Sequence, residues 1–188
     1  MAAGDPSQAV ADVQDQLAQA ELPVSRDPFF RSILRDLAGT LEEVVGPQDA
    51  KGFVAVVGAK IGDEFNDLYR TALARRELTA PQVAAACCDL KRRIGGDFYV
   101  VSQSDSEILF GNRRCPFGEK VLGRPSLCMM TSNVFGRIAA ENLGYADVAV
   151  ERAIADGDAG CTVRVTLDPD ADRAGLGREY YRTQDGER

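Results

Sequence analysis

A change in the spacing of apolar residues at Gly95 and Gly96 constrains the fold of this chain more than any other feature of its sequence. Before the two glycines, apolar residues recur at intervals of three and four, as on one face of a helix. After them, short apolar runs at residues 98–101 and 108–110 flank a polar stretch, as in a β-hairpin. The sequence therefore predicts an α+β fold, in which an N-terminal helical layer packs on an antiparallel sheet of two hairpins with a helix between them.

The individual elements follow from the same spacing and from turn residues. Asp27 and Thr79 are predicted N-caps, and Gly144 follows a helix as a C-cap. Gly58 and Gly62 lie on one face of a predicted helix and should admit a close neighbour. The predicted helices are 7–22, 27–46, 49–75, 79–94 and 125–143, and the predicted strands are 98–101, 108–110, 145–154 and 161–167.

Three segments are expected. Residues 1–26 form an amphipathic helix that acts as an interaction arm, and residues 27–168 form a sensor-like α/β domain. Residues 169–188 are rich in Asp, Arg and Gly and are expected to be a flexible acidic tail.

Charge and hydrophobicity exclude several classes of function. The net charge is −7 and the pI is about 4.7, so the chain lacks the clustered cations that bind nucleic acid or anionic membranes. No signal peptide or membrane-spanning run is evident, and we expect a cytoplasmic protein. The chain has no histidine, which removes imidazole catalysis and His-ligated haem or zinc. Its five cysteines are an odd count, so free or metal-bound thiols are expected rather than a disulfide framework.

Three of the cysteines lie where predicted elements begin or end. Cys115 opens a turn, Cys128 lies in the first turn of a helix, and Cys161 begins the last strand. Backbone N–H groups are free at such boundaries and can donate to a thiolate, as metal ligation or redox chemistry requires. A closed tetrahedral zinc site needs a fourth ligand, for which Glu151 is the first candidate and Glu141 the second.

A plainer interpretation is equally open on the pattern alone. Free cysteine is among the most buried residue types, so these three thiols also fit ordinary half-buried positions. Cys87 and Cys88 lack turn chemistry around them. We expect Cys87 to lie in the core and Cys88 to be incidental.

Four motifs resemble those of the methanogen output domain family, which is similar in turn to the 4-vinyl-reductase sensor domains. The resemblance covers roughly residues 30–168, and the motifs are Asn112-Arg-Arg-Cys-Pro-Phe-Gly, Ser126-Leu-Cys-Met-Met, Asn142-Leu-Gly-Tyr and Ile154-Ala-Asp-Gly-Asp-Ala-Gly-Cys161. It implies a mixed α/β fold shared with haem nitric-oxide sensors and Golgi transport-particle subunits, and a homodimer.

The resemblance also implies a metal site. In the aromatic-sensing relatives, zinc is held by an upstream Cys, a Glu and two Cys near the last hairpin, and Cys128, Glu151 and Cys161 match three of these ligands. Ile154 stands at about the position of the remaining Cys, so Cys115 would have to replace it, or the metal differs. Zinc is the first expectation and an iron–sulfur cluster the alternative. The proximal His of the related haem sensors has no counterpart here.

A ligand pocket between the helical layer and the sheet is a further implication of the resemblance, although an aromatic stripe is more often part of a core. Its expected lining residues are Phe53, Val57, Phe98, Tyr99, Phe110 and Phe135.

The sequence thus predicts a non-catalytic regulatory sensor domain that signals in trans to a partner protein, with a metal or a small molecule as its signal. A thiol redox enzyme or small reductase is one alternative, although the chain has no CxxC motif. A zinc-stapled adaptor is another.

Overall fold

In a computed structural model, residues 13–21, 24–171 and 177–183 are described. The chain divides into two compact units, residues 1–30 and 31–188, and each is considered by itself. In the first unit, residues 13–18 are helical. The predicted helix at 7–22 therefore lies partly outside the described residues.

The remaining predicted helices are present, with ends that differ by a few residues. Thr79 and Gln82 form a capping box at the start of α4, which satisfies backbone N–H groups that the first turn leaves free. Among the described residues, no helix is both long and apolar enough to cross a membrane. The helices are α2 (Arg26–Val45), α3 (Pro47–Ala72), α4 (Ala80–Arg93) and α5 (Cys128–Leu143), with short 3-10 turns η1 (Gly118–Val121), η2 (Pro125–Leu127) and η3 (Ile154–Asp156).

The strands form one antiparallel sheet in the order β1-β2-β4-β3-β5. They are β1 (Phe98–Gln103), β2 (Glu107–Asn112), β3 (Tyr145–Arg152), β4 (Cys161–Thr166) and β5 (Arg178–Tyr181). The two predicted hairpins are β1-β2 and β3-β4, and β2 pairs with β4 to join them.

Part of the segment predicted as a flexible tail, 169–188, is a strand. Residues 178–181 form β5, which pairs with β3 at the sheet edge, and Tyr180 is buried. Gly136 of α5 explains the close fit, because a side chain there would collide with the Tyr180 ring. A single glycine on the facing helix therefore admits an aromatic anchor that the composition of this segment did not indicate.

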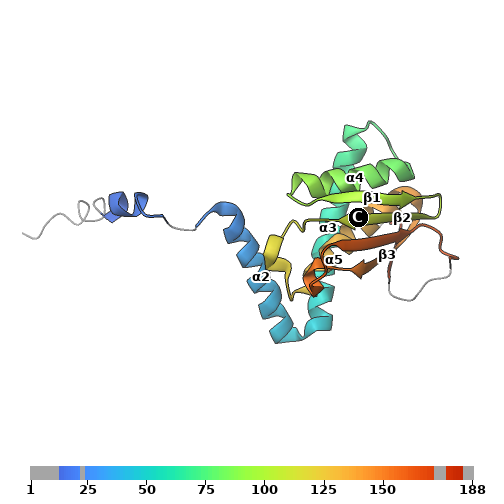
Figure 1. The fold of residues 1–188 in the computed structure, drawn as a ribbon. Coiled ribbons are helices and arrows are strands. Elements are labelled where there is room, and N and C mark those ends of the chain that lie inside the picture. The colour runs from blue at the N-terminus through green and yellow to red at the C-terminus, as the bar shows by residue number, and fades with distance from the viewer. Residues whose placement is uncertain (1–12, 22–23, 172–176, 184–188) are drawn as a thin grey trace, which may run out of the picture. The chain divides into compact units, whose positions relative to one another are not determined.

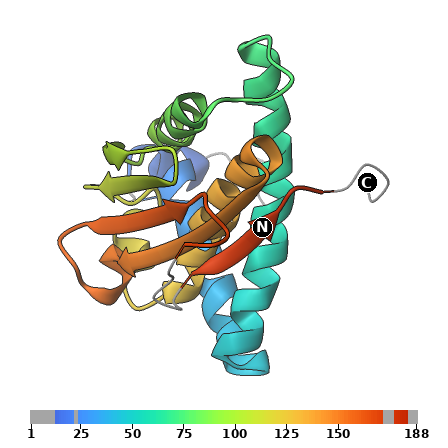
Figure 2. The ribbon, with the colours of Figure 1, turned by 90° about the vertical axis from the view of Figure 1, so that its right-hand side faces the viewer.

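The α+β prediction is confirmed, and α5 is the helix that joins the layers. It contacts β3 and β5 on one side and α3 on the other, while α4 covers β1 (Figures 1 and 2). The predicted close approach at the two glycines is also confirmed. A Cβ on Gly58 would lie 2.9 Å from the Cβ of Asn133, and one on Gly62 would lie 2.8 Å from the Cβ of Arg137.

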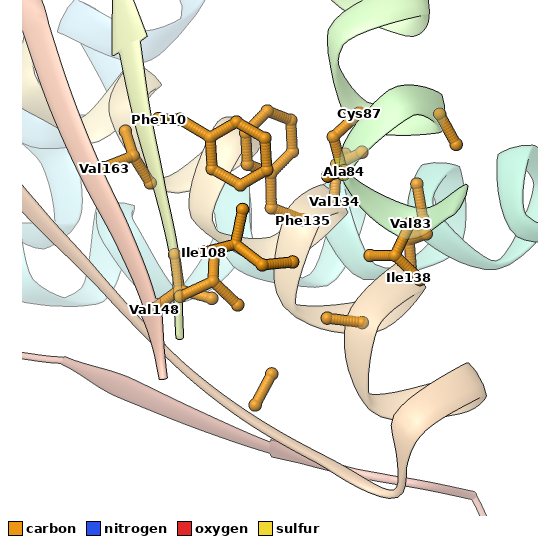
Figure 3. Close-up of a cluster of buried hydrophobic side chains, with 14 of the residues drawn as sticks. Val83, Ala84, Cys87, Ile108, Phe110, Val134, Phe135, Ile138, Val148 and Val163 are labelled. Atoms are coloured by element: carbon orange, nitrogen blue, oxygen red, sulfur yellow. The ribbon is translucent and has the colours of Figure 1, made fainter. Parts of the chain in front are cut away.

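A cluster of buried apolar side chains, which we call the core cluster, fills the space between the sheet and helices α4 and α5. Phe135 is fully buried, and its ring centroid lies 5.0 Å from that of Phe110 and 5.4 Å from that of Phe98. Figure 3 shows the rings of Phe110 and Phe135 between Cys87 of α4 and Val163 of β4. Cys87 therefore lies in the core, as predicted.

One charged residue belongs to the buried face of α4. Ile94 is 48% exposed, and the buried position beyond Leu90 is taken by Lys91. Lys91 follows Cys87 by one helical turn, so it lies on the same buried face.

Candidate functional site

Three turns at one end of the sheet bring Cys115, Cys128 and Cys161 together. Cys115 follows β2, Cys128 begins α5 directly after η2, and Cys161 begins β4. All three are free and half-buried, and all three line the same cavity. The sequence predicted a shared site for these residues, and the structure places them around one space.

The cavity, which we call the cysteine pocket, is small and largely apolar. Its volume is about 30 Å³. That is room for one ion or one or two waters, whereas pockets for drug-sized ligands measure about 300–1,000 Å³. The other lining residues are Phe98, Asn112, Pro116, Phe117, Val121, Leu127, Thr131, Val150 and Val163.

The sulfur of Cys161 accepts two N–H groups. The side-chain amide of Asn112 and the backbone N–H of Ile154 each donate to Cys161 Sγ at 3.5 Å. Asn112 is buried opposite Cys161 in the sheet, and its carbonyl oxygen accepts backbone N–H groups from Asp97 and Arg114 at 3.3 and 3.1 Å. Its amide is thereby held with the NH₂ toward the sulfur. N–H donors of this kind stabilise a thiolate.

Burial disfavours the thiolate form of the other two cysteines. It raises the pKa of Cys128 to about 12, and it raises the pKa of Cys115, although a backbone hydrogen bond from Phe117 opposes the rise there. A thiolate at Cys161 would raise both pKa values further by repulsion. Without a compensating positive charge, Cys115 and Cys128 are therefore thiols rather than thiolates at neutral pH.

Lys91 contacts two residues that line the cysteine pocket, and no sequence motif predicted its place there. Its ammonium donates to Thr131 Oγ1 at 2.8 Å and lies 5.4 Å from the Phe98 ring centroid, and both residues line the pocket. Burial lowers the pKa of Lys91 to about 8. The sequence does hold one signal for Lys91, because it follows Cys87 by one helical turn and so lies on the apolar face of the helix. Lysine is almost never fully buried unless it is paired, so its presence on that face is unusual.

Neither carboxylate proposed as a fourth ligand reaches the cysteine pocket. Glu151 accepts from Arg164 Nε at 2.6 Å, and Arg164 also pairs with Glu107 on the face of the sheet opposite the helices. Glu141 accepts from the backbone and hydroxyl of Thr183 near the other end of α5. In the described ranges, no group of three or more Cys, Asp or Glu side chains is arranged closely enough to hold a metal ion.

The residues predicted to line a ligand pocket are divided among four places. Phe98 lines the cysteine pocket, whereas Phe110 and Phe135 belong to the core cluster. Tyr99 lies on the opposite face of the sheet, where its ring packs on Gly111 and under the guanidinium of Arg113. Phe53 and Val57 are 56% and 49% exposed on α3. The predicted pocket is therefore not formed by these side chains as a set.

Phe53 and Val57 instead line an apolar groove between α2 and α3. The groove has a volume of about 190 Å³. Its walls are Leu34, Leu37, Ala38, Leu41, Phe53, Val54, Val57, Leu127 and Met130. Leu127 lines both the apolar groove and the cysteine pocket. The side chain next to Cys128 in the sequence is therefore part of the wall of both.

Fold and site together define a small α+β domain with a thiol-lined cavity at one end of its sheet. Residues 33–166 match a family described as methanogen output domain 1, and the chain belongs to that family. The resemblance seen in the four sequence motifs is thereby confirmed. The family description makes this a regulatory output domain, and an output domain acts through interaction with a partner.

Comparison with solved structures gives a remote similarity in fold. A trafficking protein particle complex subunit 3 from Naegleria fowleri, covalently bound to palmitic acid, is 15% identical, with a TM-score of 0.46 over 79% of this chain and 97% of that chain. Comparison with curated proteins gives no match.

Proposed function

We propose that this output domain is a non-catalytic sensor whose signal is received in the cysteine pocket and passed in trans to a partner protein. The observation that carries the proposal is the convergence of Cys115, Cys128 and Cys161, from three separate turns, on one cavity. Half-buried free thiols suit a reducing compartment, which supports a cytoplasmic location as part of the proposal.

The ligand we propose for the cysteine pocket is a single thiophilic metal ion, with zinc as the first candidate. Three sulfur donors suit zinc and other soft ions, and a volume of about 30 Å³ suits one ion better than an iron–sulfur cluster or an organic ligand. Cys115, Cys128 and Cys161 would hold the ion, and with Glu151 paired to Arg164 the fourth position would go to an external ligand. The three thiols would have to lose their protons and move closer together, since they do not form a metal-binding group as they stand.

Leu127 offers a route from the cysteine pocket to the protein surface. Drawing Cys128 toward an ion would move the adjacent Leu127, whose side chain also walls the apolar groove. Exposed apolar surface of this kind often marks an interaction site. We propose that the groove receives an apolar helix of the signalling partner, because its walls are nearly all aliphatic or aromatic and it lies between two helices. A homodimer that Phe53→Asp in the groove converts to a monomer would show, in a measurement of molecular mass, that the partner is a second copy of this chain.

Bound metal in anaerobically purified protein tests the proposal. We expect about one zinc per chain, lost on Cys128→Ser and retained on Cys88→Ser, because Cys88 lies on α4 and does not line the pocket. Elemental analysis gives the metal, and sulfide assay with a visible spectrum detects any iron–sulfur cluster. Equal metal content in the wild type and both variants would place the ion elsewhere, and no metal after incubation with excess zinc would refute the proposed ligand.

A thiol redox enzyme is the competing hypothesis, and the electrostatics of the site weigh against it. Exchange needs an accessible thiolate, whereas burial raises the pKa of both Cys115 and Cys128. Turnover of a disulfide substrate that is abolished by Cys128→Ser would favour the enzyme over the sensor.

A further inference from the structure

A second cavity shares Cys128 and Val150 with the cysteine pocket, and it is much larger. It lies where α5 begins, between that helix, β3 and the start of β5, and we call it the cationic pocket. Its volume is about 360 Å³. Pockets for small molecules measure about 300–1,000 Å³, so the cationic pocket has room for an organic ligand.

Two positively charged side chains line the cationic pocket. Lys51 comes from the second turn of α3, and Arg178 is the first residue of β5. Tyr180 is buried against Gly136 of α5, and Arg178, two residues earlier in the same strand, lies on that same face of the sheet. Among the described residues, neither cation forms an ion pair with a carboxylate.

The charges around the cationic pocket favour an anion. Asp156 is the one carboxylate among the described lining residues, so two cations and one anion leave a single net positive charge. Positive charge at a cavity attracts an anionic ligand, and the guanidinium of an arginine matches the geometry of a carboxylate. One carboxylate on the ligand would balance the charge of the pocket.

The rest of the wall favours an aliphatic body on that ligand. The apolar lining residues are Pro125, Met129, Val148, Val150 and Ala153. No aromatic side chain is among the described lining residues, and the Ser132 hydroxyl is already hydrogen-bonded to the Tyr180 hydroxyl at 3.0 Å. Binding is therefore favoured in proportion to the aliphatic surface that the ligand removes from water.

We propose that the cationic pocket binds an aliphatic monocarboxylate, whose carboxylate pairs with Lys51 and Arg178 and whose chain packs against Val148 and Val150. This site goes beyond the proposed metal site, because it needs none of the three sulfur donors. Since Cys128 lines both cavities, the ligand would lie against one wall of the cysteine pocket and give the domain a second input.

Equilibrium dialysis of reduced, full-length protein against radiolabelled octanoate tests the proposal. Acetate and octan-1-ol are the comparison ligands, because acetate keeps the charge without the long chain and octan-1-ol keeps the chain without the charge. We expect octanoate to bind at least about tenfold more tightly than either, since it combines a paired charge with the burial of several methylene groups.

Removing either cation should weaken the binding of octanoate and leave that of octan-1-ol unchanged. Arg178→Met and Lys51→Met should each bind octanoate about tenfold more weakly. Lys60→Met is the matched control, because it removes the same charge from an exposed position of α3 outside the pocket. Arg178→Gln gives the same comparison if circular dichroism shows that the Met variant is misfolded.

Three results would overturn the proposal. They are no binding of octanoate by the wild type, binding of octanoate no tighter than that of acetate or octan-1-ol, and equal effects of the three lysine and arginine variants. Zinc content, measured on the same preparations, separates this site from the metal site. Weaker octanoate binding by Arg178→Met with unchanged zinc supports the proposal, and octanoate binding by protein that takes up no zinc would support it while refuting the metal alone.

Discussion

The core cluster and the cysteine pocket are neighbouring regions built from similar residues, and they differ in their polar groups. Both are largely apolar, both contain thiols, and Phe98 and Val163 contribute to each. Cys87 lies in the core cluster, where burial strongly raises its pKa. Cys161 lines the pocket, where two N–H groups donate to its sulfur. Residue type alone therefore does not mark a site, whereas oriented donors and a nearby charge do.

Truncating an aromatic side chain should lower the free energy of unfolding much more in the core cluster than in the apolar groove. This is the largest effect that we predict. Phe135→Ala removes a fully buried ring from the core cluster and should lower the free energy of unfolding by about 3–5 kcal/mol. Phe53→Ala removes a ring that is 56% exposed on the apolar groove and should cost less than about 1 kcal/mol. Urea denaturation measures both, and similar losses would mean that the groove is as tightly packed as the core.

The close contacts at the glycines of α3 position α5, which contributes residues to both the core cluster and the cysteine pocket. Gly62→Ala would set a Cβ 2.8 Å from the Cβ of Arg137 on α5, which cannot move away without shifting the helix. We expect a loss of about 1–3 kcal/mol. Gly52→Ala is the matched control, because nothing lies within 4 Å of its added Cβ and alanine favours a helix by up to about 1 kcal/mol. Thermal unfolding should therefore shift in opposite directions for the two variants.

Replacing one cysteine with serine in each region compares the packing of the core cluster with that of the cysteine pocket. In the core cluster, Cys87→Ser buries a hydroxyl among apolar side chains and should cost about 2 kcal/mol. Cys128→Ser should cost less in metal-free protein, because Cys128 is half-buried and also lines an open pocket with Lys51 and Arg178, where water can reach the hydroxyl. A greater loss at Cys128 in urea denaturation would show that the cysteine pocket is the better packed of the two.

The sequence indicated the elements well because their signals are local. Helical periodicity, the capping residues and the glycines predicted α2 to α5, and the turn motifs predicted that three cysteines lie where elements begin or end. The errors arose where a partner distant in sequence decides the outcome. Glu151 pairs with Arg164 across two strands, and β5 forms because Gly136 admits Tyr180. Lys91 becomes part of the site only once α4 is packed against α5.

The smallest effect on stability that we predict concerns Asp89, a charged residue of α4 that stands two residues before Lys91. Asp89 lies on the outer side, where it accepts from Arg93 Nε at 2.5 Å and from the Tyr69 hydroxyl at 2.8 Å. These hydrogen bonds lower the pKa of Asp89 from 3.8 to about 2. The folded state thus favours the ionised carboxyl, so this contribution to stability is present above pH 4 and is lost as the pH falls toward 2.

Asp89→Asn should therefore lower the free energy of unfolding by about 1 kcal/mol at pH 7, since its arginine partners are exposed and solvent screens them. The difference from wild type should shrink as the pH approaches 2, because the wild-type carboxyl then takes up its proton as well. Urea denaturation at pH 7, 4 and 2.5 measures the trend. A difference that stays constant with pH would show that Asp89 acts through packing, as the residues of the core cluster do. A shrinking one would show that Asp89 stabilises the fold through its negative charge, whereas Lys91 on the same helix is a charge that burial disfavours.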